Sequence, residues 1–446
     1  MSASPTRFRG GAEGVPPGVS SGRSTPGSGP TILSDQAGGV LRETRLPSGI
    51  QVLTESIPSV RSAATGVWIR HGAAHESPAL EGGCHLLEHM VFKGTRTRTA
   101  RQIALELEAL GGTLDAYTSR EHTSFQARVL DRHLPQALEV LADLVLHPLL
   151  RPSDLELERQ VVLEEISMVE DTPDDLVFEL HGTGMWGGHP YGRSILGSRD
   201  AVQGFQASQL QALRESAYRG PNLVVAAAGN VDHDEVVARV ESLFGEVPAD
   251  GDPGTVHPLP DFRPGRRGVA RDLAQTHIVI GCPAPAHSDP RRHAIAVLTT
   301  AFGGGMSSIL FQRIREELGL AYTVFSYQSF LQEGGTAGVY VGTRPEWAER
   351  AEGAVLEEMA RVSREGLTDE VLEQTRNQLK GQVMLSLEST GSRLYRLAHF
   401  ALFQEEFRTL DQVLALIDGV TAEDVREVAA EFWNPDRQYT LLLGPQ

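Results

Sequence analysis

The chain has 446 residues, of which 40% are hydrophobic and 22% are charged, a composition typical of a globular protein with about two to four domains. Its 40 Lys and Arg residues against 58 Asp and Glu residues give a formal net charge of −18. An acidic surface repels phosphate groups, so nucleic acid is excluded as an expected partner and a basic peptide is favoured. The longest aliphatic run, residues 223–228, is far too short to span a membrane, so no membrane partner is expected, and two cysteines exclude a disulfide scaffold.

Residues 1–39 differ in composition from the rest of the chain. They contain nine Gly, five Pro and seven Ser, with Phe8 as the single aromatic residue. Such a segment buries too little apolar surface to offset the entropy of ordering it, which predicts a disordered tail. Arg7, Arg9 and Arg23 are typical of a mitochondrial transit peptide, but the Gly and Pro content disfavours the amphipathic helix that such a peptide needs.

From residue 40 onward, strands and helices alternate. The sequence predicts strands over residues 63–69, 124–129 and 223–228 and helices over residues 83–92, 99–110, 134–145, 153–168 and 232–244. Ser153 and Glu156 have the spacing of a capping box, which predicts the start of the helix over residues 153–168. Alternating strands and long helices predict a unit in which helices pack on one face of a sheet.

The ordered part of the chain divides into two similar halves. Residues 248–268 hold five Pro and four Gly, which indicates a linker between a domain at 40–247 and a domain at 269–446. A shift of 215 residues aligns residues 207–210 with residues 422–425 and Tyr218 with Trp433. One constant offset over separate segments indicates that the second domain is a copy of the first.

The segment from His85 to His89 has the pattern His-x-x-Glu-His. On a helix, His85 and His89 lie on one face a single turn apart, so both imidazoles reach one metal ion, and Glu88 borders the same face. Two imidazoles and a carboxylate are ligands that suit a catalytic zinc ion with an open fourth position. The alternative is a helix whose histidines have no metal.

A third ligand must come from elsewhere, and the predicted helix over residues 153–168 offers Glu158, Glu164 and Glu165. Glu158 and Glu165 are two turns apart and share a face, so one could bind the metal and the other support it. The alternative is an acidic face in solvent. The second half has no such motif and carries Lys380 in place of Glu165, so catalysis is expected in the first half alone.

The run from Gly83 to Thr95 resembles the zinc helix of the pitrilysin (M16) family of metallopeptidases. Within this family the chain is most similar to the mitochondrial processing peptidase β subunit and its bacterial relatives. Supporting motifs are residues 116–123, 162–166, 189–193 and 303–308. The resemblance covers the chain from about residue 40 to its end. It implies an α+β fold of two homologous α/β-roll domains, each a mainly antiparallel sheet packed with helices, that together form half of a clamshell chamber.

The resemblance assigns roles to residues of the first half. It implies that Glu165 is the third zinc ligand, with one Zn²⁺ per chain, and that Glu158 supports the ligands. Glu88 is then the general base that activates the zinc-bound water. Ala116 and Tyr117 lie on the strand that binds substrate, which is expected to pair with a peptide backbone.

The resemblance also implies a second group of functional residues. Arg315 and Tyr322 match a pair that hydrogen-bonds the scissile carbonyl and the oxyanion formed from it. Asp175 and Glu179 match acidic positions that recognise an arginine near the cleavage point, and their spacing of four puts them on one face if they are helical. The alternative for this acidic pair is an ordinary helix start, where carboxylates favour the dipole.

These observations predict a zinc-dependent endopeptidase that cleaves peptides or unfolded segments. The resemblance implies a homodimer in which the zinc half of one protomer faces the second half of its partner. The alternative is a non-catalytic structural or peptide-binding subunit of a respiratory or processing complex. The bacterial cytoplasm is the expected location, with the mitochondrial matrix as the alternative.

Overall fold

The computed structural model describes residues 31–36, 39–252, 254 and 256–445. Its first half contains a seven-stranded sheet with the strand order β1-β2-β3-β7-β4-β6-β5. The strands are β1 (Thr31–Gln36), β2 (Gly39–Arg45), β3 (Gln51–Ser56), β4 (Ser62–Ile69), β5 (Thr113–Thr118), β6 (Thr123–Leu130) and β7 (Leu223–Gly229). Only the β3–β7 pair is parallel among these described strands.

The second half contains a five-stranded sheet with the order β10-β11-β9-β12-β8. Its strands are β8 (Gly265–Ala270), β9 (Thr276–Ala284), β10 (Ala321–Phe330), β11 (Gly335–Thr343) and β12 (Tyr439–Gly444). The β8–β12 pair is parallel and the others are antiparallel. The prediction of two mainly antiparallel sheets packed with helices is therefore confirmed.

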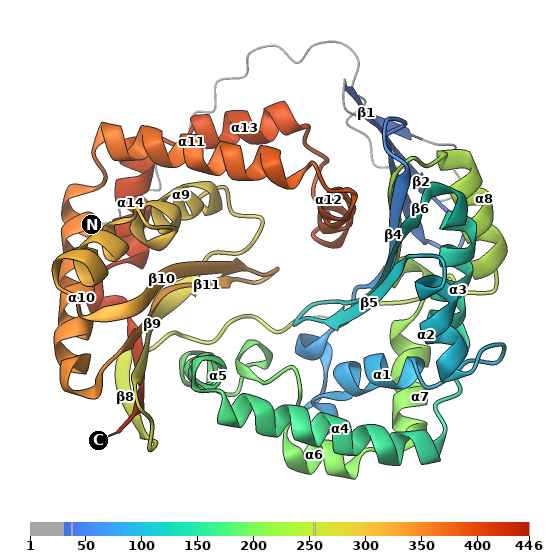
Figure 1. Ribbon diagram of the computed structural model, residues 1–446, viewed down its shortest axis with the longest axis horizontal. Helices are drawn as coiled ribbons and strands as arrows, with labels where there is room; N and C mark the ends of the chain where they lie inside the picture. Colours follow the sequence, from blue (N-terminus) through green and yellow to red (C-terminus); the bar gives the residue numbers. More distant parts are fainter. Residues whose placement is uncertain (1–30, 37–38, 253, 255, 446) are drawn as a thin grey trace, which may run out of the picture.

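Helices cover both sheets (Figure 1). The helices that precede the linker in the chain are α1 (Gly83–Val91), α2 (Ala100–Glu108), α3 (Leu134–Leu146), α4 (Pro152–Asp171), α5 (Pro173–Trp186), α6 (Arg199–Gly204), α7 (Ala207–Ala217) and α8 (His233–Phe244). Those encoded after it are α9 (Arg292–Gly303), α10 (Ala348–Glu365), α11 (Asp369–Ser386), α12 (Thr390–Leu402), α13 (Leu410–Asp418) and α14 (Ala422–Phe432). Among the described residues, no helix is both long and apolar enough to cross a bilayer.

The two halves exchange one helix each. Helix α12 buries Leu394 and Leu397 against Trp68 of β4, on the first sheet. Helix α5 buries Val177 against Val279 of β9, on the second sheet. A shift of 215 residues moves α5 onto 388–401, almost the range of α12, so the exchange is reciprocal between equivalent helices. Figure 1 shows α12 beside β4 and α5 beside β9, and the exchange ties the halves together.

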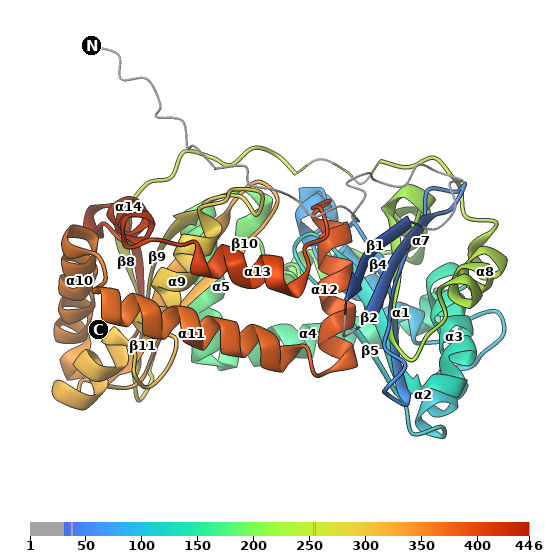
Figure 2. The same ribbon diagram turned by 90° about the horizontal axis from the view of Figure 1, so that it is seen from above.

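Three predicted boundaries differ from the structure. Strand β1 (Thr31–Gln36) pairs with β2, so the disordered tail predicted for residues 1–39 is wrong for this segment; residues 1–30, 37 and 38 lie outside the described residues. A neighbouring strand supplies the backbone hydrogen bonds that composition does not reveal. The connection between the halves, which crosses one side of the molecule in Figure 2, ends when β8 begins at Gly265, within the predicted linker 248–268.

The third difference is the start of α4. The helix begins at Pro152, with Arg151 as its N-cap, and no side chain caps it. Proline suits the first helical turn because its missing N–H would have no partner there. Ser153 is therefore already inside the helix, and the predicted capping box with Glu156 does not form.

Candidate active site

Helix α1 presents two different faces. Leu86, Leu87 and Met90 are buried in the core of the first half. The opposite face carries His85 and His89, which are only partly buried, with ring centroids 4.6 Å apart. The core packing of one face therefore fixes the orientation of the two histidines on the other.

Glu165 of α4 lies against this histidine pair. Its Oε2 atom is 3.6 Å from His85 Nε2 and 3.5 Å from His89 Nε2. One candidate ligand atom from each of the three residues lies within 4.8 Å of the other two. The structure thus brings together His85, His89 and Glu165, while Glu164 is exposed.

These three residues fit a zinc ion. Glu165 Oε2 is buried and has no hydrogen-bond partner among the described residues, which is costly for a carboxylate oxygen that binds nothing. Burial, together with the neighbouring His89, lowers the pKa of His85 to about 4, so this imidazole is neutral and available as a ligand at neutral pH. Two imidazole nitrogens and one carboxylate oxygen are the protein ligands of many catalytic zinc sites.

Glu158 supports His89 from the other side. Its Oε2 atom lies 3.2 Å from His89 Nδ1, and its Oε1 atom lies 2.5 Å from Lys93 Nζ. A carboxylate that accepts the Nδ1–H of a histidine leaves the Nε2 lone pair free for a metal. Lys93 was not predicted from the sequence, although it lies one helical turn after His89.

Glu88 makes contact with the end of strand β5. The Thr118 hydroxyl donates a hydrogen bond of 2.6 Å to Glu88 Oε2. Burial raises the pKa of Glu88, the Thr118 hydrogen bond and His89 lower it, and the nearby Glu165 raises it again. Glu88 is thus held beside the three candidate ligands as a carboxyl group with an increased proton affinity. Thr118 belongs to the motif at residues 116–123, but the sequence does not indicate a function for it.

Strand β5, which carries Ala116 and Tyr117, is an edge strand of the first sheet. Ala116 packs against the core, and Tyr117 points to the other face, where its hydroxyl lies 3.0 Å from His122 Nε2. The Tyr117 ring stacks on Tyr395 of α12 at 6.1 Å between centroids. The outer edge of β5 has no partner strand in the described part of the chain, so its backbone groups are available for a peptide.

Arg315 and Tyr322 lie together in the second half. The guanidinium of Arg315, in the π-helical turn Phe311–Glu317, lies 4.3 Å above the Tyr322 ring and donates through Nη1 to the Tyr322 carbonyl oxygen at 3.0 Å. No contact recorded for the described residues joins this pair to Glu88 or to the three candidate ligands. Within one chain, the structure brings together each group of predicted residues and leaves the two groups apart.

Asp175 and Glu179 lie on α5, so the helical spacing assumed for them is present. Burial raises the pKa of Glu179, the nearby Arg120 lowers it, and the charge of Asp175 raises it. Arg120 also donates through Nε to the Tyr191 carbonyl oxygen at 2.8 Å. The acidic pair therefore has one arginine of its own, which sequence reasoning did not find because Arg120 is 59 positions away from Glu179.

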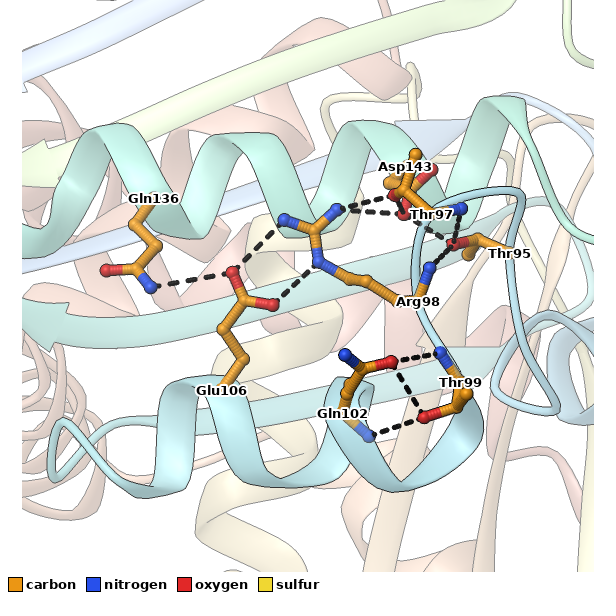
Figure 3. A network of polar contacts seen from close by, with 8 residues as sticks. All are labelled: Thr95, Thr97, Arg98, Thr99, Gln102, Glu106, Gln136 and Asp143. Atoms are coloured by element: carbon orange, nitrogen blue, oxygen red, sulfur yellow. Dashed lines mark hydrogen bonds and ion pairs between the residues drawn. The ribbon is translucent and has the colours of Figure 1, made fainter.

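Both ends of α1 are anchored by carboxylates that the sequence did not reveal. At its start, Glu76 accepts hydrogen bonds from the backbone N–H groups of Gly82 and Cys84, at 2.7 and 2.6 Å. After its end, Asp143 Oδ2 accepts hydrogen bonds from side chains of the following loop: Thr95 at 2.5 Å, Thr97 at 2.6 Å and Arg98 at 2.8 Å (Figure 3).

The chain matches two family models. Residues 51–199 match the insulinase family of peptidases (M16), and residues 204–379 match the inactive domain of M16 peptidases. A relative from Streptomyces coelicolor, named an uncharacterized zinc protease, is 41% identical over 411 residues, 90% of this chain and 89% of the relative. An uncharacterized zinc protease of Bacillus subtilis is 37% identical over 396 residues, 89% of this chain and 96% of the relative.

Solved structures share the fold. A protease from Helicobacter pylori has a TM-score of 0.84 at 21% identity, over 91% of this chain and 100% of that chain. An M16 inactive-domain protein from Pseudomonas fluorescens has a TM-score of 0.85 at 20% identity, over 91% of this chain and 98% of that chain. The chain shares the fold of these structures and carries a His-x-x-Glu-His helix, and the relatives that it matches are named zinc proteases. The chain belongs to peptidase family M16.

Proposed function

We propose that this protein is a zinc-dependent endopeptidase that cleaves peptides and unfolded segments in the bacterial cytoplasm. The observation that carries the proposal is the convergence of His85, His89 and Glu165, with Glu88 beside them and an edge strand ending at Thr118. A catalytically silent relative would not need all four groups. The bacterial relatives named zinc proteases support the same conclusion.

His85, His89 and Glu165 would hold the zinc ion, and Glu158 would fix the orientation of His89. Bound zinc supplies Lewis acidity, which lowers the pKa of a water molecule towards neutrality. Glu88 takes the proton from the attacking water and delivers it to the leaving amine. The raised pKa of Glu88 suits both steps, because a group must accept the proton and release it again.

The free edge of β5 would hold the substrate as an added strand, with Ala116 and Tyr117 beside the extended backbone. Arg315 and Tyr322 would donate hydrogen bonds to the oxygen that gains negative charge when the carbonyl is attacked. Since no contact among the described residues of one chain joins this pair to Glu88, we propose that a second copy supplies it. A homodimer would then have two sites, each built from the zinc half of one protomer and the second half of its partner.

The test combines metal analysis with hydrolysis of a quenched fluorescent peptide. The purified protein should contain about one zinc per chain, lose hydrolysis on chelation and regain it with added zinc. Glu165→Gln should lose zinc, whereas Glu164→Gln, at the exposed neighbouring position, should retain zinc and activity. A chain that binds zinc and peptides without cleaving them would instead support the non-catalytic, peptide-binding alternative.

A further inference from the structure

A surface cleft of about 420 Å³ lies where strand β10 begins and strand β11 ends. The residues that line it include Arg315, Tyr322, Arg344 and Trp347. Strand β10 is an edge strand of the second sheet, so the cleft opens beside backbone groups that have no partner strand in the described part of the chain. A peptide that pairs with β10 would pass the mouth of this cleft.

A β-bulge shapes one wall of the cleft. The register between β10 and β11 shifts between Ala321 and Thr323, which leaves Tyr322 as the extra residue. Tyr322 is 74% exposed, and its carbonyl oxygen accepts the hydrogen bond from Arg315. Arg315 lies between the rings of Tyr322 and Phe311, at 4.3 and 4.7 Å. This packing fixes the guanidinium of Arg315, whose Nε is 3.8 Å from the exposed Glu316.

Arg344 forms the other side of the cleft. It directly follows β11, is exposed, and stacks on Trp347 with Cζ 4.7 Å from the ring centroid. Among the described residues it has no ion pair, in a chain with a net charge of −18. The equivalent position in the first half, the N-cap of the short turn that follows β6, holds Leu130. The second half therefore has a positive charge, positioned by an aromatic ring and without a counterion among the described residues, where the first half has an apolar residue.

We propose that this cleft binds a carboxylate of the peptide substrate, with Arg344 as its ligand and Arg315 adding positive charge. The proposal rests on the proposed peptidase function. A guanidinium donates two parallel N–H groups to the two oxygens of a carboxylate, and stacking on Trp347 reduces the side-chain entropy lost on binding. The carboxylate comes either from the C-terminus of the peptide or from an Asp or Glu side chain near the bond that is cut.

The experiment measures peptide binding in the Glu88→Gln background, where no cleavage interferes. Two series of fluorescent peptides share one neutral sequence. The first compares a free C-terminus with an amidated C-terminus. The second keeps the amidated C-terminus and compares Glu with Gln at each position in turn. Fluorescence anisotropy gives the Kd of each. We expect the free acid, or the Glu peptides at one or two positions, to bind about fivefold tighter than their neutral partners. The peptide series that shows the preference identifies the source of the carboxylate.

Arg344→Gln should reduce the ratio of Kd values between neutral and charged peptides to about one. Arg344→Glu should make the neutral peptide the tighter ligand. Arg350→Gln, which changes another exposed arginine of the same half outside the cleft, should leave the preference unchanged. Equal binding of charged and neutral peptides, or a preference that survives Arg344→Gln, would overturn the proposal. If the wild type cleaves no peptide while the Arg344-dependent preference remains, the cleft stands and the peptidase function fails. If the wild type cleaves peptides but shows no preference for a carboxylate, the peptidase function stands and the proposal for the cleft fails.

Discussion

Thr118 donates its hydroxyl hydrogen to Glu88 across 2.6 Å, which joins the last residue of edge strand β5 to the carboxylate of helix α1. The strand that we propose binds substrate and the residue that we propose moves the proton are therefore held in a fixed relation. A peptide added to this edge would lie next to Glu88. Positioning of this kind contributes to catalysis because the reacting groups need not be brought together at each turnover.

Glu88→Gln should retain zinc and lose hydrolysis by at least a hundredfold, because it removes the base and keeps the shape of the side chain. Zinc content by mass spectrometry and kcat/KM for a quenched peptide measure the two effects separately. Glu164→Gln, on the exposed side of α4, is the matched control and should behave like the wild type. A Glu88→Gln enzyme with a tenth of the wild-type rate would falsify the assignment of Glu88.

Lys93→Met should weaken zinc binding about tenfold, the lower end of the range for partners of metal ligands. Lys93 lies 2.5 Å from Glu158, which in turn lies 3.2 Å from His89. Without the ammonium group, the Glu158 carboxylate is less firmly oriented towards the His89 ring. Competition with a zinc chelator measures the affinity. Lys93→Arg keeps the positive charge and should retain most of the zinc affinity. An equal loss of zinc affinity in both variants would show that Lys93 acts through packing and not through its charge.

Features within a single helix can be predicted from the local sequence pattern, whereas contacts between segments that are distant in the sequence cannot. The His-x-x-Glu-His spacing places His85 and His89 on one face because an α-helix repeats every 3.6 residues. The 215-residue offset correctly indicates two related halves, since α7 and α14 have the same length and lie 215 residues apart. Spacing could not choose between Glu158, Glu164 and Glu165; the packing of α4 on α1 brings Glu165 within 3.6 Å of His85 and 3.5 Å of His89.

The clearest example of a contact between distant segments that the sequence does not reveal is the exchange of α5 and α12, in which each helix packs on the sheet of the other half. Only the assembled fold shows that Val177 packs on the second sheet and Leu397 on the first. The same limit applies to Asp143, which lies 48 positions from Thr95 and fixes the loop after α1. Single buried acids that accept several donors give no local signal in a sequence.

Acid should destabilise the protein through buried histidines. His181 is 2% exposed, and its burial lowers the pKa to about 4, below the ordinary histidine value of 6.5. Above pH 6.5 His181 is neutral in both the folded and the unfolded state, so it does not change the free energy of unfolding. Below pH 6.5 the unfolded chain binds a proton at this histidine and the folded chain does not, so stability falls as the pH decreases towards 4. This single group should cost about 2 kcal/mol between pH 7.5 and pH 5.

Urea unfolding at the two pH values measures this loss. His181→Gln should show a smaller decrease in unfolding free energy on acidification, whereas His257→Gln, at an exposed position, should show the same decrease as the wild type. A wild-type midpoint that does not move between pH 7.5 and pH 5 would contradict the prediction.

Mixing two inactive variants should test the shared site. Glu88→Gln protomers retain Arg315, and Arg315→Ala protomers retain Glu88, so one of the two sites in each mixed dimer is complete. Random exchange makes half of the dimers mixed, which gives about a quarter of the wild-type activity. Each variant alone and the double variant mixed with itself are the controls. If subunit exchange is shown by mass and no activity returns, assembly of the site from two protomers is wrong.

The acidic pair on α5 should select substrates with an arginine near the cleavage point. Asp175 is exposed on the first turn of α5, and Glu179 follows on the same face, beside Arg120. Because Arg120 already neutralises part of this charge, we expect a substrate arginine to gain about tenfold in kcat/KM over alanine, not more. Asp175→Asn with Glu179→Gln should remove this advantage and leave the alanine peptide unchanged. Asp174→Asn, which removes a neighbouring acid from the same helical turn, is the control for effects on the helix dipole. An equal loss on both peptides would show that the pair stabilises the helix and does not recognise substrate.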